Sequence, residues 1–150
     1  MEIEKIHTTL NRISPITNVT GQLILTRLMI PLLSNAEKSI IVNTTSGLGA
    51  FPKDDGLVYS AGKAAMRNFT AGLQYALKGS NIKVLEFIPP VTDTAMTEDR
   101  DVQKMSAKKL VERILPQLQQ EKKILTVPKM KFFLWIAFLF PSLAHKILSK

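Results

Sequence analysis

Residues 42–63 read VNTTSGLGAFPKDDGLVYSAGK, and this stretch decides both the fold and the candidate chemistry. It opens inside a short β-branched run over residues 39–45, which is typical of a strand buried on both faces. A loop rich in Gly, Pro and Asp follows, and a helical pattern starts at residue 58. Ser46 is therefore predicted to lie at the carboxyl end of a buried strand. Open α/β sheets bind their ligands at this end of their strands.

The predicted helix begins with a Tyr-x-x-x-Lys pattern, Tyr59 and Lys63, thirteen positions after Ser46. Residues at i and i+4 share one face of a helix, so the phenol and the ammonium can approach one site. A neighbouring ammonium favours the phenolate, which would make Tyr59 a usable proton donor and acceptor. The pattern alone arises often by chance and equally describes a half-buried tyrosine beside a solvated lysine. The serine at the strand end favours the catalytic interpretation.

The rest of the chain alternates between helical and strand patterns. Helices are predicted over residues 2–33, 58–77, 106–118 and 132–148, with bends or breaks at Pro15, Pro116 and Pro141, and further strands over residues 83–88 and 124–127. The face predicted for the second helix consists of Ala65, Phe69, Leu73 and Leu77. This order favours an α/β fold in which helical crossovers join parallel strands. Because three strands form a small sheet, we expect part of a larger doubly wound parallel sheet.

Composition narrows the class of protein. With 150 residues, 45% of them hydrophobic, the chain is an ordinary globular sequence rather than a disordered or fibrous one. It has no cysteine, which excludes disulfides, thiolate catalysis and cysteine-ligated zinc, and we predict no metal site. The N-terminus has no apolar core of signal-peptide type, so a cytoplasmic location is expected. Residues 101–150 carry ten basic and three acidic side chains, against ten and nine in residues 1–100, so the net charge of +8 belongs to the C-terminal third.

Four segments resemble the short-chain dehydrogenase/reductase family, in the same order, within residues 11–127. They are residues 18–21 (NVTG), 43–46 (NTTS), 59–63 (YSAGK) and 89–94 (PPVTDT). The Pro-Pro pair after the second strand and the Ser-Gly-Leu-Gly turn are similar to the bacterial DltE-type branch. The resemblance implies a partial Rossmann-like fold. It also implies hydride transfer between NAD or NADP and a small-molecule carbonyl or alcohol substrate.

The resemblance implies a role for each matching side chain. Tyr59 would be the general acid/base that protonates a carbonyl oxygen or deprotonates an alcohol. Lys63 would support its phenolate and bind the nicotinamide ribose, and Ser46 would orient and polarise the substrate oxygen. Asn18 would hold a water in a proton relay towards Lys63. Alternatively, Asn18 satisfies a helix distorted by Pro15.

Two further positions match the part of the family that holds the nicotinamide. The implied cofactor-binding residues are therefore Tyr59, Lys63, Pro89 and Thr94. The hydroxyl and backbone of Thr94 would hold the carboxamide, and Pro89 would shape that wall. Thr94 is alternatively the cap of a turn or a short helix.

The sequence departs from the family where the cofactor's phosphates would bind. The family's Gly-rich turn, Thr-Gly-x-x-x-Gly-x-Gly, receives the pyrophosphate at a helix N-terminus, and these 150 residues do not contain it. Gly47-Leu-Gly49 lies after the serine, in the wrong place to replace it. We therefore expect residues 1–128 to be the C-terminal portion of such a domain, truncated before its cofactor-binding half. The alternative is a catalytically inactive fragment or paralogue that acts only through association with subunits or a membrane surface.

Residues 129–150 form a basic and apolar helical segment. Its uninterrupted apolar run, residues 132–140, has nine residues, far fewer than the ~20 needed to span a bilayer. Two interpretations stay open: a lid and wall of the substrate pocket, or a helix in a membrane interface with Trp135 and flanking lysines as anchors. Nucleic-acid binding is not expected, because the basic residues are scattered and no known motif accompanies them. His145 is interpreted as a solvated residue at a helix end.

The resemblance also implies a homo-oligomer, a dimer or a tetramer. It would form through the first helix and the helix of residues 59–77, where Gly72 and Ala76 permit close approach of a partner helix. An unpaired strand edge and bare apolar helix faces would favour association as well.

Overall fold

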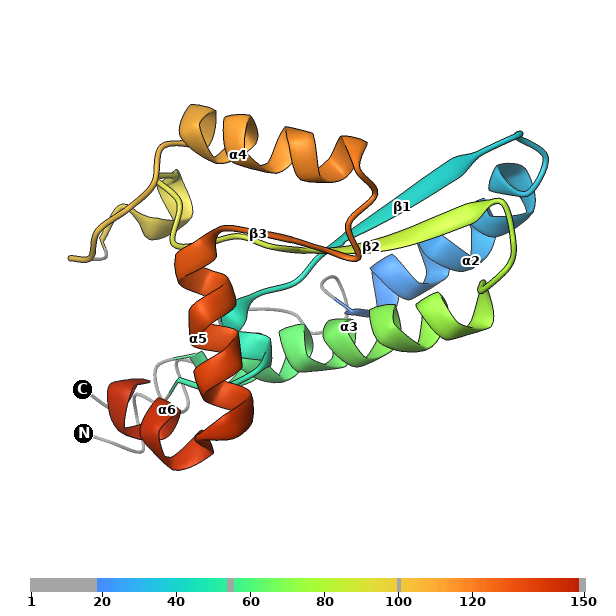
Figure 1. Ribbon diagram of the computed structural model, residues 1–150. Coiled ribbons are helices and arrows are strands. Elements are labelled where there is room, and N and C mark those ends of the chain that lie inside the picture. Colours follow the sequence, from blue (N-terminus) through green and yellow to red (C-terminus); the bar gives the residue numbers. More distant parts are fainter. Residues whose placement is uncertain (1–18, 54–55, 100, 149–150) are drawn as a thin grey trace.

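The computed structural model describes residues 19–53, 56–99 and 101–148, with side chains up to residue 144. Helices and strands alternate along the chain, as predicted (Figure 1). They are α2 (Gly21–Leu33), β1 (Ser39–Thr44), η2 (Gly47–Gly49), α3 (Leu57–Ala76), β2 (Ile82–Ile88), η4 (Ala95–Thr97), α4 (Ala107–Gln119), β3 (Ile124–Thr126), α5 (Pro128–Leu139) and α6 (Pro141–Leu148). The first part of the helix predicted over residues 2–33, with its bend at Pro15, lies outside the described residues.

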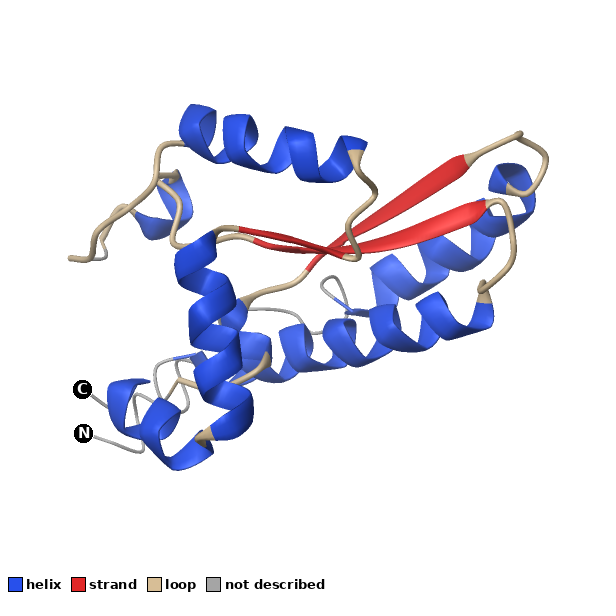
Figure 2. Ribbon diagram, viewed as in Figure 1, coloured by secondary structure: helices blue, strands red, loops and turns tan. Residues whose placement is uncertain are grey.

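The three strands form one parallel sheet in the order β1-β2-β3 (Figure 2). Asn43 of β1 pairs with Glu86 of β2, and Glu86 pairs in turn with Ile124 of β3. The parallel α/β arrangement is therefore confirmed. Because all three strands run the same way, the residues that follow β1, β2 and β3 emerge at one edge of the sheet.

Helices cover the sheet from both sides. Helices α2 and α3 lie below the strands in Figure 1, and α4 lies above them. On the α3 side, the amide of Asn43 donates a hydrogen bond to the Thr70 hydroxyl, 3.1 Å away. The core centres on the middle strand and its neighbours, where Met66, Leu85, Ile88, Leu125 and Val127 are at most 2% exposed.

The prediction that the first strand is buried on both faces is wrong. Ile40 and Val42 are 39% and 42% exposed, although Ser39 and Asn43 on the opposite face are buried. This face of β1 is exposed because α4 packs beside β3, at the opposite edge of the sheet. No described strand pairs with the outer edge of β1. A run of β-branched residues predicts a strand, but only the neighbouring elements determine how many of its faces are covered.

The face predicted for the helix of residues 58–77 is found only in part, because Phe69, Leu73 and Leu77 are half-buried. The buried residues of α3 are Ser60, Met66 and Thr70, whereas Ala65 is exposed. Two of these three carry hydroxyls, so a pattern of apolar residues does not reveal them. The burial of Thr70 is compensated because its hydroxyl donates to the Met66 carbonyl at 2.7 Å and accepts from Asn43.

Prolines and caps set the ends of the later helices. Ser106 caps α4, as predicted, by accepting a hydrogen bond from the Lys109 amide. The helix continues three residues beyond Pro116. Pro128 starts α5 earlier than predicted, because proline is well tolerated in the first turn of a helix. Pro141 begins α6 and so confirms the predicted break. In the described parts of the chain, no helix is both long and apolar enough to cross a membrane.

Candidate active site

Ser46 follows the last residue pair of β1 and starts the turn that leads to α3. Its backbone is extended, and its hydroxyl oxygen accepts a hydrogen bond from the Leu48 amide at 3.2 Å, which caps η2. The hydroxyl oxygen therefore accepts a hydrogen bond, whereas the hydroxyl proton has no acceptor among the described residues. Such a hydroxyl can donate a hydrogen bond to a ligand oxygen.

Tyr59 and Lys63 lie one turn apart near the start of α3. The Lys63 Nζ lies 5.7 Å from the centroid of the Tyr59 ring. It also donates a 2.9 Å hydrogen bond to the Thr44 carbonyl, at the carboxyl end of β1. The structure thus brings the Tyr-x-x-x-Lys pair to the strand end that carries Ser46, as the spacing predicts.

The Lys63 ammonium is half-buried, and burial lowers the pKa of this lysine below its ordinary value of 10.5. Desolvation disfavours the charged form, and the Thr44 carbonyl only partly replaces the lost water. Thr44 is the one acceptor given to Lys63 by the described residues. An ammonium has three protons, so donors remain for a ligand.

Two glycines hold the serine turn against the neighbouring helices. A Cβ on Gly49 would lie 2.7 Å from the carbonyl carbon and oxygen of Lys63, so η2 touches the backbone of α3. A Cβ on Gly47 would lie 2.8 Å from the Met130 sulfur and 3.6 Å from a ring carbon of Phe133, both on α5. The Gly-Leu-Gly segment therefore joins the serine turn to α3 and α5. The sequence predicts for this segment a resemblance to the DltE-type branch and no phosphate-binding turn, but not these contacts.

A cluster of buried and half-buried polar side chains lies next to the serine turn. Glu86, in the middle of β2, is 7% exposed. Its carboxylate accepts a 2.7 Å hydrogen bond from the Thr45 hydroxyl and pairs with the Arg67 guanidinium of α3 at 3.0 Å. Thr45 directly precedes Ser46, so this cluster fixes the peptide that leads into the serine. Sequence reasoning missed it, although a lone acidic residue inside the apolar run of residues 83–88 was the available signal.

Among the described residues, no hydrogen bond or ion pair joins the other predicted site residues, Pro89 and Thr94, to this group. Pro89 follows β2 directly and is half-buried, whereas Thr94 is exposed at the start of η4. The Thr94 hydroxyl lies 3.4 Å from that of Thr97, in a capping box. Thr94 therefore does act as a cap, and its contact with a cofactor stays a prediction. Asn18 lies outside the described residues.

A solvent-open depression beside η4 does not include the candidate site. It is lined by Asp93, Glu98, Asp99, Asp101, Val102 and Lys104. Across the described ranges, no three His, Asp or Glu side chains gather as metal ligands would.

Comparison with known proteins places the chain in a family. Residues 7–105 match the short chain dehydrogenase family. The uncharacterized oxidoreductase DltE of Bacillus subtilis is 32% identical over 108 residues, which are 68% of this chain and 43% of that protein. A serine 3-dehydrogenase of Agrobacterium fabrum is 36% identical over 81 residues, 54% of this chain and 32% of the relative. The chain thus spans less than half the length of these relatives.

The fold agrees with this match. The crystal structure of a short chain dehydrogenase from Burkholderia cenocepacia in complex with NADP superposes with a TM-score of 0.81 at 21% identity. The superposition covers 91% of this chain and 57% of that one. The strand-end serine, the Tyr-x-x-x-Lys helix and the parallel sheet therefore lie in a Rossmann-like fold, and the chain belongs to the short-chain dehydrogenase/reductase family of oxidoreductases.

Proposed function

We propose that this site transfers a proton to or from the oxygen of a carbonyl or alcohol substrate, as part of a nicotinamide-dependent oxidation–reduction. The observation that carries the proposal is the placement of Lys63. Its ammonium is held beside the Tyr59 ring and at the carboxyl end of β1, where Ser46 begins the next turn. A cation at this point stabilises the negative charge that develops on the phenol oxygen when Tyr59 gives up its proton.

Each side chain then has a distinct task. The Tyr59 hydroxyl would protonate the carbonyl oxygen in reduction and become a phenolate, and in oxidation the phenolate would take up the proton of the alcohol. The Ser46 hydroxyl would donate a hydrogen bond to the same oxygen, since its oxygen accepts from the Leu48 amide and its proton is left for the ligand. The remaining protons of Lys63 would bind hydroxyls of the nicotinamide ribose. Asn18 would position a water that reconnects Lys63 with solvent.

NAD or NADP would supply or accept the hydride when bound. The residues present fit its nicotinamide end, because Lys63 has donors left after Thr44, and Pro89 and Thr94 follow the neighbouring strand β2. The 150 residues contain no Gly-rich turn for its pyrophosphate. We therefore propose that the chain is the C-terminal portion, residues 1–128, of such a domain, followed by the basic and apolar helical segment of residues 129–150.

The competing proposal is an inactive fragment or paralogue that acts only through association, and the bare face of β1 favours it. Isothermal titration of the full chain with NAD and with NADP separates the two. Binding at millimolar affinity or tighter supports the oxidoreductase, and the absence of binding contradicts it for this chain. Where turnover is measurable, Tyr59→Phe should lower kcat at least about a hundredfold. Tyr75→Phe, at an exposed tyrosine of the same helix, should leave kcat unchanged.

We also propose that the chain self-associates through α2 and α3. Leu25, Leu28 and Leu32 of α2 are each about 60% exposed, at 59%, 64% and 63%, and a Cβ on Gly72 of α3 would meet nothing within 4 Å. Sedimentation velocity should show dimers or larger species, and Leu28→Glu should shift the chain towards monomer. A monodisperse monomer at high concentration would contradict this proposal.

A further inference from the structure

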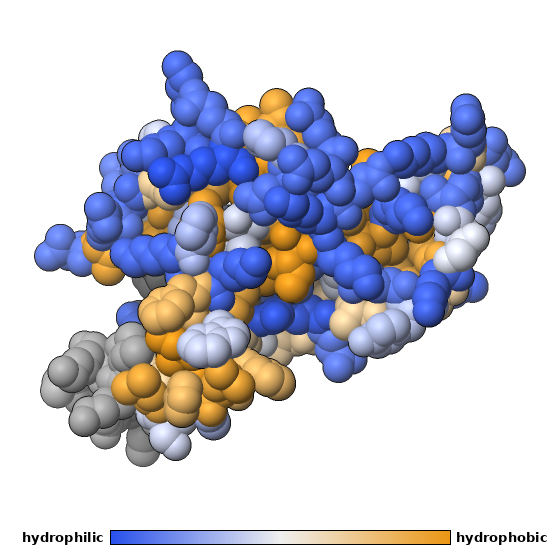
Figure 3. All heavy atoms as spheres, in the orientation of Figure 1, coloured by the Kyte–Doolittle hydropathy of each residue, from blue (hydrophilic) through white to orange (hydrophobic). Residues whose placement is uncertain are grey.

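Six large apolar side chains extend into solvent from α5, from α6 and from Phe140 between them. Their exposed fractions range from 44% for Leu139 to 83% for Phe138. Figure 3 shows apolar residues gathered over these helices, next to a surface that is mostly hydrophilic. We call this set the apolar tip, and its members are Phe132, Trp135, Phe138, Leu139, Phe140 and Leu143.

The apolar tip is not the face of α5 that packs on the fold. The packed face carries Met130 and Phe133, which meet the serine turn at Gly47, and Ala137, which is 8% exposed. At 3.6 residues per turn, Phe132, Trp135 and Phe138 lie on the other side of the helix. The inner face can therefore act as a wall near the candidate site. That role leaves the outer face unexplained, and a surface of this kind marks an interaction site.

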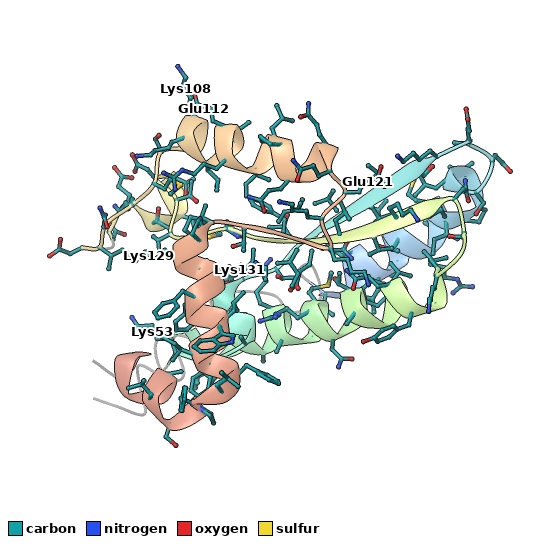
Figure 4. All side chains as sticks on the ribbon, viewed as in Figure 1. Lys53, Lys108, Glu112, Glu121, Lys129 and Lys131 are labelled. Carbon is teal, nitrogen blue, oxygen red and sulfur yellow. The ribbon has the colours of Figure 1, made fainter. Side chains whose placement is uncertain are left out.

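The charges at the base of α5 indicate what binds there. Lys129 and Lys131 are exposed in the first turn, and Figure 4 shows them at the end of the helix nearer the sheet. Residues 128–148 contain no Asp or Glu, so a second copy of the same surface offers no carboxylate to these lysines. Lipid phosphates do offer anionic oxygens to them. A surface of aromatic and aliphatic residues bordered by lysines is typical of proteins that lie in a membrane interface.

The aromatic residues suit the same environment. The rings of Phe132 and Trp135 stack with their centroids 6.4 Å apart while more than half of each side chain stays exposed. Tryptophan prefers the level of the lipid headgroups, where one part of its ring is apolar and its N–H remains hydrated. About 10 Å of helix separates Lys131 from Phe138. The far end of α5 can therefore enter the acyl chains while Lys131 stays at the level of the phosphates.

We propose that α5 and α6 dock this chain on membranes that contain anionic lipids. Phe138, Phe140 and Leu143 enter the acyl chains, Trp135 lies near the headgroups, and Lys129 and Lys131 contact lipid phosphates. The docking needs no nicotinamide cofactor, so it stands or falls separately from the proposed oxidoreductase activity.

Vesicle binding by the full chain tests the proposal. The chain should sediment with vesicles of phosphatidylcholine and phosphatidylglycerol, much less with phosphatidylcholine alone, and less as NaCl rises. Trp135 is the only tryptophan of the sequence, so its emission reports directly on the apolar tip. On the mixed vesicles the emission should shift to shorter wavelength, and brominated acyl chains should quench it.

Two pairs of variants localise the contact. Phe138→Glu should lower the vesicle partition coefficient about tenfold or more, whereas Tyr75→Glu, at an aromatic residue 78% exposed on α3, should leave it unchanged. The double variant Lys129→Glu/Lys131→Glu should lower partitioning about tenfold or more, because each lysine contributes at an anionic surface. Lys108→Glu/Lys109→Glu makes the same change in net charge on α4, which Figure 4 shows at the far side of the sheet, and should have a much smaller effect.

Several results would overturn the proposal. They are an unshifted Trp135 emission on anionic vesicles, binding that survives Phe138→Glu, and equal losses in the two lysine pairs. Sedimentation without vesicles that Phe138→Glu abolishes would assign the apolar tip to a second copy of the chain instead. Circular dichroism of every variant shows whether a loss reflects unfolding. The single charge change at exposed Phe138 should leave the spectrum unaltered.

Discussion

Gly49 is in close contact with the backbone of Lys63 in α3. A Cβ at Gly49 would lie 2.7 Å from the Lys63 carbonyl carbon and oxygen, and 3.0 Å from the amide nitrogen of Ala64. These atoms belong to a helix backbone, which cannot rotate away as a side chain can. The turn that carries Ser46 and the helix that carries Tyr59 are thus in direct contact through a residue with no side chain.

Gly49→Ala should therefore destabilise the fold by about 1–3 kcal/mol, the usual cost of overpacking a well-packed contact. Gly62→Ala in α3 is the matched control, because its Cβ would meet only a methyl of Val19 at an ordinary 3.5 Å. That control should gain about 0.5–1 kcal/mol from better helix propensity. Urea unfolding followed by circular dichroism measures both. Equal stabilities for the two variants would contradict the close approach.

Breaking the buried ion pair should cost more than breaking an exposed one. Arg67→Met leaves the Glu86 carboxylate buried without its cation and should lower the free energy of unfolding by about 2–3 kcal/mol, somewhat less than for a fully buried pair, because Arg67 is 25% exposed. Adding Glu86→Gln to Arg67→Met should recover much of that loss, since the amide oxygen can still accept from Thr45.

The control for this experiment is the pair Lys38–Glu121, in which Lys38 is 60% exposed. Lys38→Ala should change the free energy of unfolding by less than about 1 kcal/mol. A loss as large as that of Arg67→Met would show that solvent does not screen the two pairs differently.

Gln117 of α4 takes the place of a fourth strand at the edge of β3. Its amide nitrogen donates to the Thr126 carbonyl at 2.9 Å, and its amide oxygen accepts from the Thr126 amide at 3.2 Å. Gln117→Ala should lower the free energy of unfolding by about 1–3 kcal/mol. The backbone N–H and C=O of buried Thr126 would then both lose their hydrogen-bond partner. Gln119→Ala, at an exposed position of the same helix, should stay within about 0.5 kcal/mol of the parent chain. Thermal unfolding compares the two.

Lys63 should lose its proton at a lower pH in the folded chain than in the unfolded one. Burial lowers its pKa below 10.5, so the folded state binds fewer protons than the unfolded state as pH approaches that value. Stability should accordingly rise with pH over the window between the folded pKa and 10.5, and Lys63→Met should abolish that rise. Any turnover should fall over the same window, because the cation beside Tyr59 disappears. NMR titration of the lysine side-chain carbons, with and without urea, measures the shift.

Local patterns were sufficient to predict the elements that order this fold. The three strands, their parallel direction, the cap at Ser106 and the break at Pro141 depend on nearby residues and were predicted. How much of each strand or helix is buried depends on residues that are distant in the sequence. The open face at Ile40 and Val42 and the buried hydroxyl of Thr70 are set by which helix lies opposite, and periodicity in a single segment carries no information about that.

In the candidate site, too, the residues could be predicted from local patterns, whereas the contacts between them could not. Ser46, Tyr59 and Lys63 could be named because short spacings on one strand end and one helix define them. The bond from Lys63 to the Thr44 carbonyl, the contact of Gly49 with α3 and the support of Thr45 by Glu86 join positions 14 to 41 residues apart. Such contacts depend on how the elements pack against one another, which a pattern within one segment does not show.

The peptide ahead of Ser46 is held from three directions. The Thr44 carbonyl accepts from Lys63, the Thr45 amide donates to the Phe87 carbonyl at 2.8 Å, and the Thr45 hydroxyl donates to Glu86. Little conformational entropy is left in this segment for a ligand to remove. A substrate oxygen would therefore meet a preorganised serine, and more of its binding energy would remain available as affinity.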